Sequence, residues 1–278
     1  SASITGGGFS YTDTGSVSVG NVNSVVGITT SGNVDLTIGS NLTVTNSISA
    51  GNNGDIVLTA GGIVDIDATV SSNTSGIVSL SANEDIDVGA AISSSNTGTG
   101  ISISADDDNS GAGTLTLSGA GTLLDTSGGN GDIGIVADDF AITGSGDINA
   151  GTGNVSITSS TASSIGLGNA DQDVDISTAE LGAINAANVT LGDSTNTTAI
   201  VIDGLSATGT GNLTGTLFLE AGGSNVPVTF QNNASTIAAN VNLDINVSNG
   251  DVNVGTDLTL SGTGGFNLSS VNGDVTFG

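Results

Sequence analysis

Apolar and polar residues alternate along most of this chain in short runs, and the runs recur at a regular interval. Lines that begin at Gly32, Gly54 and Gly76 read GNVDLTIGSNLTVTNSISAGNN, GDIVLTAGGIVDIDATVSSNTS and GIVSLSANEDIDVGAAISSSNT. Alternation with a period of two is typical of strands that bury one face. Each line holds two clear runs and a shorter third, separated by Gly, Asn and Ser, which predicts three short strands per repeat.

Equivalent apolar positions in the three lines form columns. The first column holds Val34, Ile56 and Val78, and the other columns are Leu36, Leu58 and Leu80; Leu42, Val64 and Ile86; Val44, Ile66 and Val88; and Ile48, Val70 and Ile92. A repeat of this size cannot bury its apolar face alone, but copies stacked on one another can. The sequence therefore predicts an all-β fold, a right-handed parallel β-solenoid (β-helix) with about 22 residues per coil and about 12 coils.

Short alternating apolar runs separated by Gly, Asn and Ser continue along the whole chain, so we interpret 1–278 as a single β-solenoid domain. We expect irregular first coils at 1–31, regular coils at 32–98, an insertion at about 104–130 and less regular coils at 131–278. No obvious cap is visible at either end. The best helix candidate, STAELGAINAANV at 177–189, is predicted to hold one short turn at most. The aromatic residues expected in the narrow core are Phe140, Phe218, Phe230 and Phe266.

Pairs of Gly with Asp or Asn recur just before the predicted strands. Glycine accepts a positive φ at a corner, and Asn or Asp tolerates it while bonding to the local backbone. The pairs therefore indicate corners, and we interpret the aspartates as outward-pointing structural residues: Asp55, Asp132, Asp147, Asp251 and Asp274.

The charge balance excludes several classes of function. The chain has 27 acidic residues and no Lys, Arg, His or Cys, which gives a formal net charge of −27. Nucleic-acid binding needs cations against phosphate, so no nucleic-acid partner is expected. No apolar run approaches the length that spans a bilayer, so we expect no membrane insertion. Nucleophilic catalysis based on His or Cys is impossible.

Several stretches resemble a known family. GDIVLTAGGIVDIDA, GNVSITSS and GDINAGTGNVSI look like the repeats of filamentous haemagglutinin-type giant bacterial surface exoproteins, and ISTAELGAINAANVTLGDSTNTTAIVIDG at 176–204 is similar to a recurrent unit in them. The resemblance covers most of 30–278. It implies a right-handed β-helix, export to the cell exterior and service as a fibre or adhesin shaft. The chain departs from the family in lacking Lys and Arg, and the family's N-terminal secretion domain is not visible.

The expected function is therefore a structural module of an extracellular bacterial filament, fibre or giant adhesin at the cell surface, and not an enzyme. Solenoid ends without a cap leave strand edges that invite pairing. We accordingly expect either self-association of copies head to tail into filaments or continuation in a longer chain.

One turn is a candidate metal site. In DDDNSG at 106–111, Asp106, Asp108 and Ser110 match the first half of an EF-hand loop, but Leu117 stands where the bidentate Glu would be. A simple Ca²⁺-binding turn and a solvated acidic loop both fit this pattern. No cofactor is required by anything else in the sequence.

Two alternative functions remain open. One is a β-solenoid that binds ice, a polysaccharide or another glycan or cell-surface ligand through alternating Thr hydroxyls, although the Thr positions do not hold one column in the repeats. The other is a glycosidase that uses paired carboxylates. Its candidates are Asp106–Asp108, Asp138–Asp139 and the cluster Asp171, Asp173 and Asp175, but only seven aromatic residues are available as sugar platforms.

Overall fold

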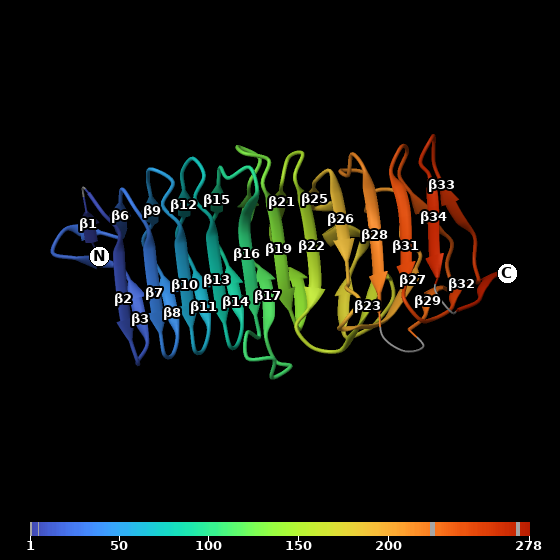
Figure 1. Cartoon of the computed structure of the whole chain (residues 1–278), viewed down its shortest axis with the longest axis horizontal. Coiled ribbons are helices and arrows are strands. Elements are labelled where there is room, and N and C mark those ends of the chain that lie inside the picture. The colour runs from blue at the N-terminus through green and yellow to red at the C-terminus, as the bar shows by residue number, and fades with distance from the viewer. Residues whose placement is uncertain (1, 5, 223–225, 271–272) are drawn as a thin grey trace. The chain divides into compact units, whose positions relative to one another are not determined.

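A computed structural model describes residues 2–4, 6–222, 226–270 and 273–278 of the chain. The structure is all-β, with parallel strands stacked about 24 residues apart in a β-solenoid of about 11 turns, which confirms the predicted fold class. The chain divides into two compact units (Figure 1). Unit 1 comprises Ser1–Ala137 and Ile142–Gly153, and unit 2 comprises Asp138–Ala141 and Asn154–Gly278. The prediction of one domain stays a prediction.

Unit 1 is a stack of coils whose strands fall into three parallel sheets. The first sheet contains, in order, β2 (Phe9–Asp13), β7 (Val34–Ile38), β10 (Ile56–Ala60), β13 (Val78–Ala82), β16 (Thr99–Ala105) and β19 (Asp132–Ala137). The second contains β3 (Val17–Val19), β8 (Leu42–Val44), β11 (Val64–Ile66), β14 (Ile86–Val88) and β17 (Thr114–Leu117). The third contains β1 (Ala2–Ile4), β6 (Ile28–Thr30), β9 (Ile48–Ala50), β12 (Val70–Ser72), β15 (Ile92–Ser94), β18 (Ala120–Asp125) and β21 (Ser145–Asn149). A hairpin of β4 (Asn21–Val22) and β5 (Val25–Val26) lies between β3 and β6.

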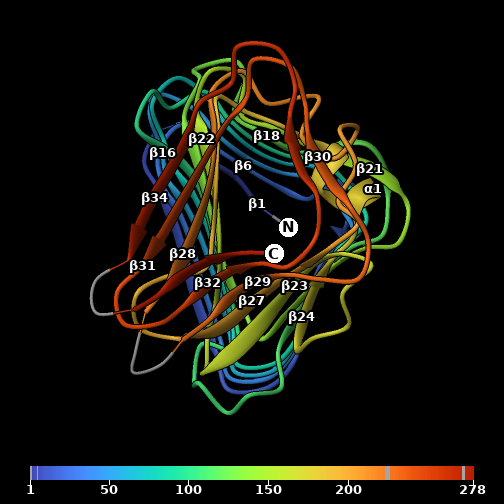
Figure 2. The ribbon, with the colours of Figure 1, turned by 90° about the vertical axis from the view of Figure 1, so that its right-hand side faces the viewer.

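Unit 2 repeats the arrangement with longer connections. Its first sheet contains β22 (Asn154–Ser159), β26 (Asn188–Leu191), β28 (Thr216–Ala221), β31 (Asn242–Val247) and β34 (Phe266–Ser270). The second contains β24 (Val174–Ile176), β23 (Ser163–Gly168), β27 (Thr197–Asp203), β29 (Val228–Phe230), β32 (Val252–Val254) and β35 (Val275–Phe277). Short strands complete the third side (Figure 2): β25 (Ile184–Asn185), β30 (Ser235–Ile237) and β33 (Leu258–Leu260). β20 (Asp139–Ile142) starts in unit 2 and ends in unit 1.

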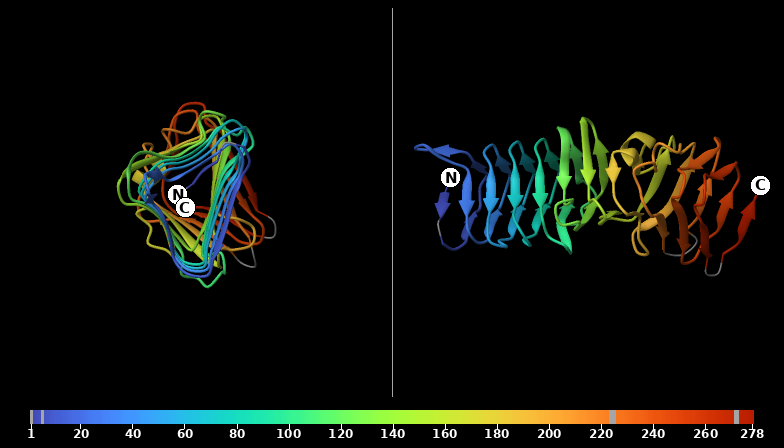
Figure 3. Two further views of the ribbon diagram at one scale, coloured as in Figure 1. Left: turned by 90° about the vertical axis from the view of Figure 1, so that its left-hand side faces the viewer. Right: turned by 90° about the horizontal axis from the view of Figure 1, so that it is seen from above.

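The coils of unit 1 wind in the right-handed sense. In Figure 1 the near strands β7, β10 and β13 run downwards, and the chain returns behind them while it advances toward β16. Seen along the coil axis, these turns enclose a three-sided interior (Figure 3). This hand is the one that nearly all parallel crossover connections adopt.

The predicted columns form the core of unit 1. Ile56 lies in register with Val34 on one side and Val78 on the other, and the remaining columns align in the same way. Their side chains are fully buried, because each coil covers the apolar face of its neighbour. Among the aromatic residues, Phe140 and Phe230 are buried as expected.

The other two predicted core aromatics, Phe218 and Phe266, are not buried. Phe218 sits half-buried on the outer face of β28, since Leu217 and Leu219 take the inward positions of that strand. Phe266 occupies an inward position, in register with Leu243, but it belongs to the last strand of its sheet and is 39% exposed.

The predicted insertion at about 104–130 is smaller than expected. The loop at 106–113 between β16 and β17 leaves the coil, whereas β17 and β18 pair with the strands of the neighbouring coils, β18 with a register shift between Thr122 and Leu124. Leu115 and Leu117 continue the columns of Ile86 and Val88. The alternation in TLTL therefore does indicate a strand of the coil. The loop before it makes this strand occur later in the sequence than the regular repeat would place it.

The structure corrects the expected role of the Gly–Asp and Gly–Asn corners. Gly54 and Gly76 do not have positive φ; they are needed because coils approach closely, and a Cβ at Gly54 would lie 2.3 Å from the Gly32 carbonyl oxygen. The Asn33 side-chain oxygen accepts the Asp55 N–H at 3.1 Å, and Asp55 accepts the Ile77 N–H at 3.0 Å. These side chains thus satisfy backbone donors of the next coil rather than of their own corner.

Helix is confined to one turn among the described residues. In α1 (Thr178–Gly182), Ser177 accepts the Glu180 N–H, and the Glu180 carboxylate accepts the Ser177 N–H at 2.9 Å, so a capping box stabilises the helix start. The expectation of one short turn is confirmed. Among the described residues, no helix is long and apolar enough to cross a membrane.

Candidate functional site

The acidic turn at 106–111 is organised by its own hydrogen bonds. Asp106 has φ of 62° and its side chain is buried. Its carboxylate accepts the Ser110 N–H at 2.7 Å, the Ser110 hydroxyl at 2.9 Å and the Gly111 N–H at 3.0 Å. Asp108 accepts the Ser110 N–H at 3.2 Å and is exposed. Hydrogen bonds within the turn therefore hold its backbone, and Ca²⁺ at Asp106, Asp108 and Ser110 stays a prediction.

Replacing Asp106 with alanine is expected to destabilise the chain by about 2–4 kcal/mol, because three loop donors lose their acceptor and alanine is strained at positive φ. Asp108→Ala is the control, with an expected change within about 0.5 kcal/mol, since Asp108 is exposed and accepts one long bond. Thermal denaturation followed by circular dichroism measures both. Equal effects of the two substitutions would contradict this account of the turn.

The same variants test the calcium prediction. A Ca²⁺ ion bound to the folded turn would raise the melting temperature of the wild type relative to chelator at matched ionic strength. Asp108→Ala should lose that increment while it keeps the melting temperature measured in chelator. An unchanged melting temperature of the wild type would show that the turn binds no Ca²⁺. Across the described residues, no group of three or more acidic side chains is arranged to hold a metal ion.

A second acidic site joins two clusters that the sequence had kept apart. Asp139 accepts the Phe140 N–H at 2.8 Å and also a backbone N–H of Asp175. Burial is the main cause that raises the pKa of Asp139, and the charges of Asp175 and Glu180 raise it further. β24 brings Asp175 to this place because it lies beside β23 rather than on the following coil. No signal in the sequence indicates that placement, nor the presence of Glu180.

The arrangement around Asp139 does not form a complete catalytic pair. Paired carboxyl groups are the catalytic groups of most glycosidases, but Asp175 and Glu180 both accept structural hydrogen bonds here. Asp175 accepts the Gln172 N–H at 2.7 Å, and Glu180 serves the capping box of α1. The adjacent aromatic side chain, Phe140, is buried in the core and offers no platform for a sugar.

Two other predicted carboxylates, those of Asp138 and Asp173, accept hydrogen bonds from hydroxyl or backbone N–H groups. Asp138 accepts the Thr161 hydroxyl at 2.7 Å. Asp173 accepts the Ser164 N–H at 2.9 Å and its hydroxyl at 2.7 Å. The backbone carbonyl of Asp171 accepts a bond from the Gln172 side chain. The structure therefore brings together Asp139 and Asp175 of these two clusters and leaves the remaining members in separate bonds.

Stacked carboxylates cover part of the outer surface of unit 1. Asp65 and Asp87 are register partners on β11 and β14. Burial is the first cause that raises the pKa of Asp65, and the charges of Asp67 and Asp87 add to it. The surrounding groove is lined by Ile63, Asp65, Asp85, Ile86, Asp87, Thr114 and Thr116. This face is a source of like-charge repulsion within the folded chain.

Hydroxyl groups form part of one column on the first sheet of unit 1, but Thr does not hold that column across the repeats, as expected, and Val136 ends it. Thr12, Thr37 and Thr59 lie in register, and Ser81 and Ser104 continue the line. The neighbouring outward column is mixed: Ser10, Asp35, Val57, Ser79 and Ser102. A charged and an apolar residue interrupt the surface there, so the face does not present two matched hydroxyl columns.

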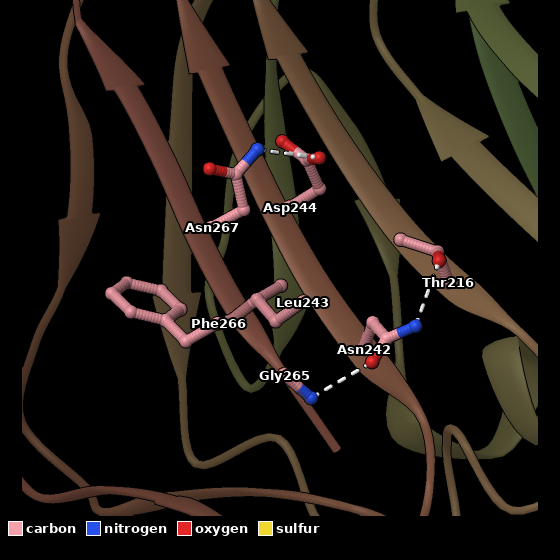
Figure 4. A pocket seen from close by; sticks show the side chains of 7 residues that line it. All are labelled: Thr216, Asn242, Leu243, Asp244, Gly265, Phe266 and Asn267. Atoms are coloured by element: carbon pink, nitrogen blue, oxygen red, sulfur yellow. Dashed lines mark hydrogen bonds between the residues drawn. The ribbon is translucent and has the colours of Figure 1, made fainter.

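A shallow pocket on β28, β31 and β34 of unit 2 is polar at its surface (Figure 4). The Asn267 amide donates to Asp244 at 2.9 Å, and Asn242 accepts the Gly265 N–H at 2.8 Å. Phe266 lines this pocket, but its register with Leu243 places it in an inward column. The Asn and Asp side chains of this pocket therefore bond mainly to neighbouring strands of the same sheet.

The N-terminal end of unit 1 exposes core side chains. β1, β2 and β3 are the first strands of their sheets, so within the described chain no strand pairs with their outer edges. The opening above them is lined by Phe9, Tyr11, Val17, Ser18, Val19, Ile28 and Leu36. Tyr11 is 41% exposed there, although its partner in the next coil, Leu36, is buried.

The C-terminal end of unit 2 has the same character. β33, β34 and β35 are the last strands of their sheets. Phe277 is 66% exposed and Val275 is 41% exposed, whereas their register partners Val254 and Val252 are buried. A cavity at this end is lined by Val254, Thr256, Asp257, Leu258, Leu260, Phe266, Phe277 and Gly278.

The two coil ends are therefore the candidate functional surfaces of this chain. Strand edges template the pairing of further strands, and exposed core positions gain from burial. Comparison with protein families, with curated proteins and with solved structures gives no match for this chain.

Proposed function

We propose that this chain is a structural module of an extracellular bacterial filament or giant surface protein, built by β-coils that continue one another end to end. The observation that carries the proposal is the exposure of core positions at both coil ends, against complete burial of the same columns within each unit. The resemblance of its lines to filamentous haemagglutinin-type repeats supports the same role. No enzymatic activity is part of the proposal.

The end surfaces fit another β-coil better than a small ligand. Each end offers parallel strand edges in three directions around an apolar centre, and a further coil would pair with all three edges while it buries that centre. Phe277 alone would bury an aromatic side chain, which stabilises by about 1.5–3 kcal/mol. The net charge of −27 opposes association in dilute salt, so screening should favour it.

Phe277→Asp is expected to weaken self-association at least tenfold, because it removes apolar area and adds a charge at the joint. Val57→Asp is the matched control, since Val57 is 38% exposed on the flank of unit 1. Sedimentation velocity of the purified chain over a range of concentrations and salt measures the effect, and electron microscopy of the same samples shows whether the species are rods or fibres.

Two results would contradict the proposal. A wild-type chain that stays monomeric at high concentration and high salt would show that its end surfaces do not stack. Equal weakening by Phe277→Asp and Val57→Asp would show that association involves the flanks instead of the ends.

A further inference from the structure

The hairpin β4–β5 is an addition to an otherwise regular corner. Val19 and Ile28 align with Val44 and Ile48 of the next coil, yet they are nine positions apart where the later pair is four apart. The same corner also spans four positions from Ile66 to Val70. Five extra residues are therefore inserted in the first complete corner of unit 1.

The inserted residues form a defined element rather than a loose loop. Asn21 pairs with Val26 and Val22 with Val25, in the one antiparallel ladder among the described strands. Asn23 and Ser24 have φ of 49° and 66°, as a two-residue hairpin turn of the primed type requires. An isolated two-stranded hairpin is marginally stable in water, so a partner surface would stabilise it.

This hairpin exposes apolar side chains instead of burying them. Val22 is 57%, Val25 40% and Val26 54% exposed. None of the three lines the opening of the core at the N-terminal end, so the hairpin does not act as a cap over that core. In Figures 1 and 3 it extends past β1, away from the coils that follow.

We propose that the hairpin packs against the last coil of a second copy of this chain, which stacks on β1, β2 and β3. A coil that paired with those strand edges would lie beside the projecting hairpin and would cover Val22 and Val25, which pair with each other and share one face of it. The inference rests on the proposed end-to-end function and adds a lateral contact that fixes the rotation of one copy on the next.

Charge favours a second copy of this acidic chain as the occupant. Residues 1–34 carry one acidic side chain, Asp13, and residues 258–278 carry one, Asp274, out of 27 in the whole chain. The ends can therefore approach each other with little of the repulsion that opposes contact between flanks.

Two variants test the hairpin without disturbing the coils. The triple substitution Val22→Thr, Val25→Thr and Val26→Thr keeps β-branched side chains but removes apolar contact. Deletion of 21–25 shortens the corner to the four-position spacing of the later coils. The flank substitutions Val57→Thr and Val136→Thr provide the control, since these valines are exposed within unit 1. Circular dichroism verifies that each variant melts like the wild type.

Both hairpin variants are expected to weaken self-association at least tenfold in sedimentation velocity, while the control leaves it unchanged. The chain has no cysteine, so Val25→Cys carrying a photo-crosslinker gives one reactive position. It should crosslink to residues 242–278 of another copy, as identified by mass spectrometry.

The failures are distinguishable. Association that Phe277→Asp abolishes but the hairpin variants leave intact would overturn the hairpin contact and keep the proposed function. Crosslinks found only within one chain would also overturn the contact. A wild-type chain that never associates would overturn both.

Discussion

Gly76→Ala is expected to lower stability by about 3–5 kcal/mol and the melting temperature by roughly 6–15 °C. A Cβ at residue 76 would lie 2.1 Å from the Gly54 carbonyl oxygen and 2.2 Å from the Ser72 hydroxyl oxygen. That hydroxyl donates to the same carbonyl at 2.7 Å and is buried, so the substitution strains the backbone and disturbs a buried hydrogen bond. Neither group can move freely, because the coils on both sides hold the corner in register.

The matched control for this prediction is Gly89→Ala. Its Cβ would have no neighbour nearer than 3.5 Å, and its φ is not positive. A change within about 1 kcal/mol is expected, since alanine there mainly restricts the unfolded chain. Thermal melts and urea titrations followed by circular dichroism compare the two variants. If both variants melt like the wild type, close approach between coils is not the reason for glycine at these corners.

The regular coils could be predicted because two physical signals agree. The period of two in Leu36, Leu58 and Leu80 reports a buried strand face, and the repeat interval reports which residues stack. In TLTL at 114–117 the period of two alone indicates the strand, because the loop before it places Leu115 29 positions after its register partner Ile86.

The corners and the irregular coils could not be predicted in the same way. A glycine recurring at the position of Gly54 and Gly76 can be explained either by a positive φ or by a close approach between coils. The structure decides between them, because the Gly54 carbonyl oxygen lies against residue 76. Likewise, an Asp after a Gly can bond to its own turn or to the next coil. Both hydrogen-bonding patterns are compatible with the same residue types at the same spacing, so the sequence does not distinguish them.

The hairpin left one faint signal. Apolar Val22, Val25 and Val26 flank Asn23–Ser24 in a segment that has five residues too many for a corner. The sequence indicated only that 1–31 is irregular. The meeting of Asp139 with Asp175 left no signal at all, because it depends on β24 lying beside β23 after a loop of ordinary composition.

Moderate acid is expected to stabilise this chain, with a rise in melting temperature on the order of 5 °C between pH 7 and about pH 4.5. The folded state holds 27 acidic side chains without a basic partner, so its carboxylates repel one another. Burial first, and neighbouring charges second, raise the pKa of Asp65 and of Asp139 above their ordinary values. A carboxyl whose folded-state pKa is raised stabilises the fold when protonated, and that stabilisation is lost as the pH rises through the folded-state pKa.

Other carboxylates act in the opposite direction and set the lower limit of the stable range. The Gly15 N–H, at 2.8 Å, is the main cause that lowers the pKa of Asp13, and the Tyr11 hydroxyl adds to it. The side chains of Asn232 and Asn233 lower the pKa of Asp203. Their stabilisation is present above the unfolded-state pKa and is lost as the pH falls through the folded-state value, so stability should decline again below about pH 3.

Two single substitutions separate these effects by sign. Asp65→Asn should raise the melting temperature at pH 7 and reduce the gain on acidification, because the carboxylate that acid would neutralise is already absent. Asp13→Asn should lower the melting temperature at pH 7 and change it less at about pH 3, where Asp13 is losing its charge in the wild type. Sodium chloride should raise the melting temperature at pH 7 more than at about pH 4.5, since fewer charges remain to be screened in acid. Stability that falls steadily from pH 7 to about pH 4.5 would mean that local hydrogen bonds to carboxylates outweigh their mutual repulsion.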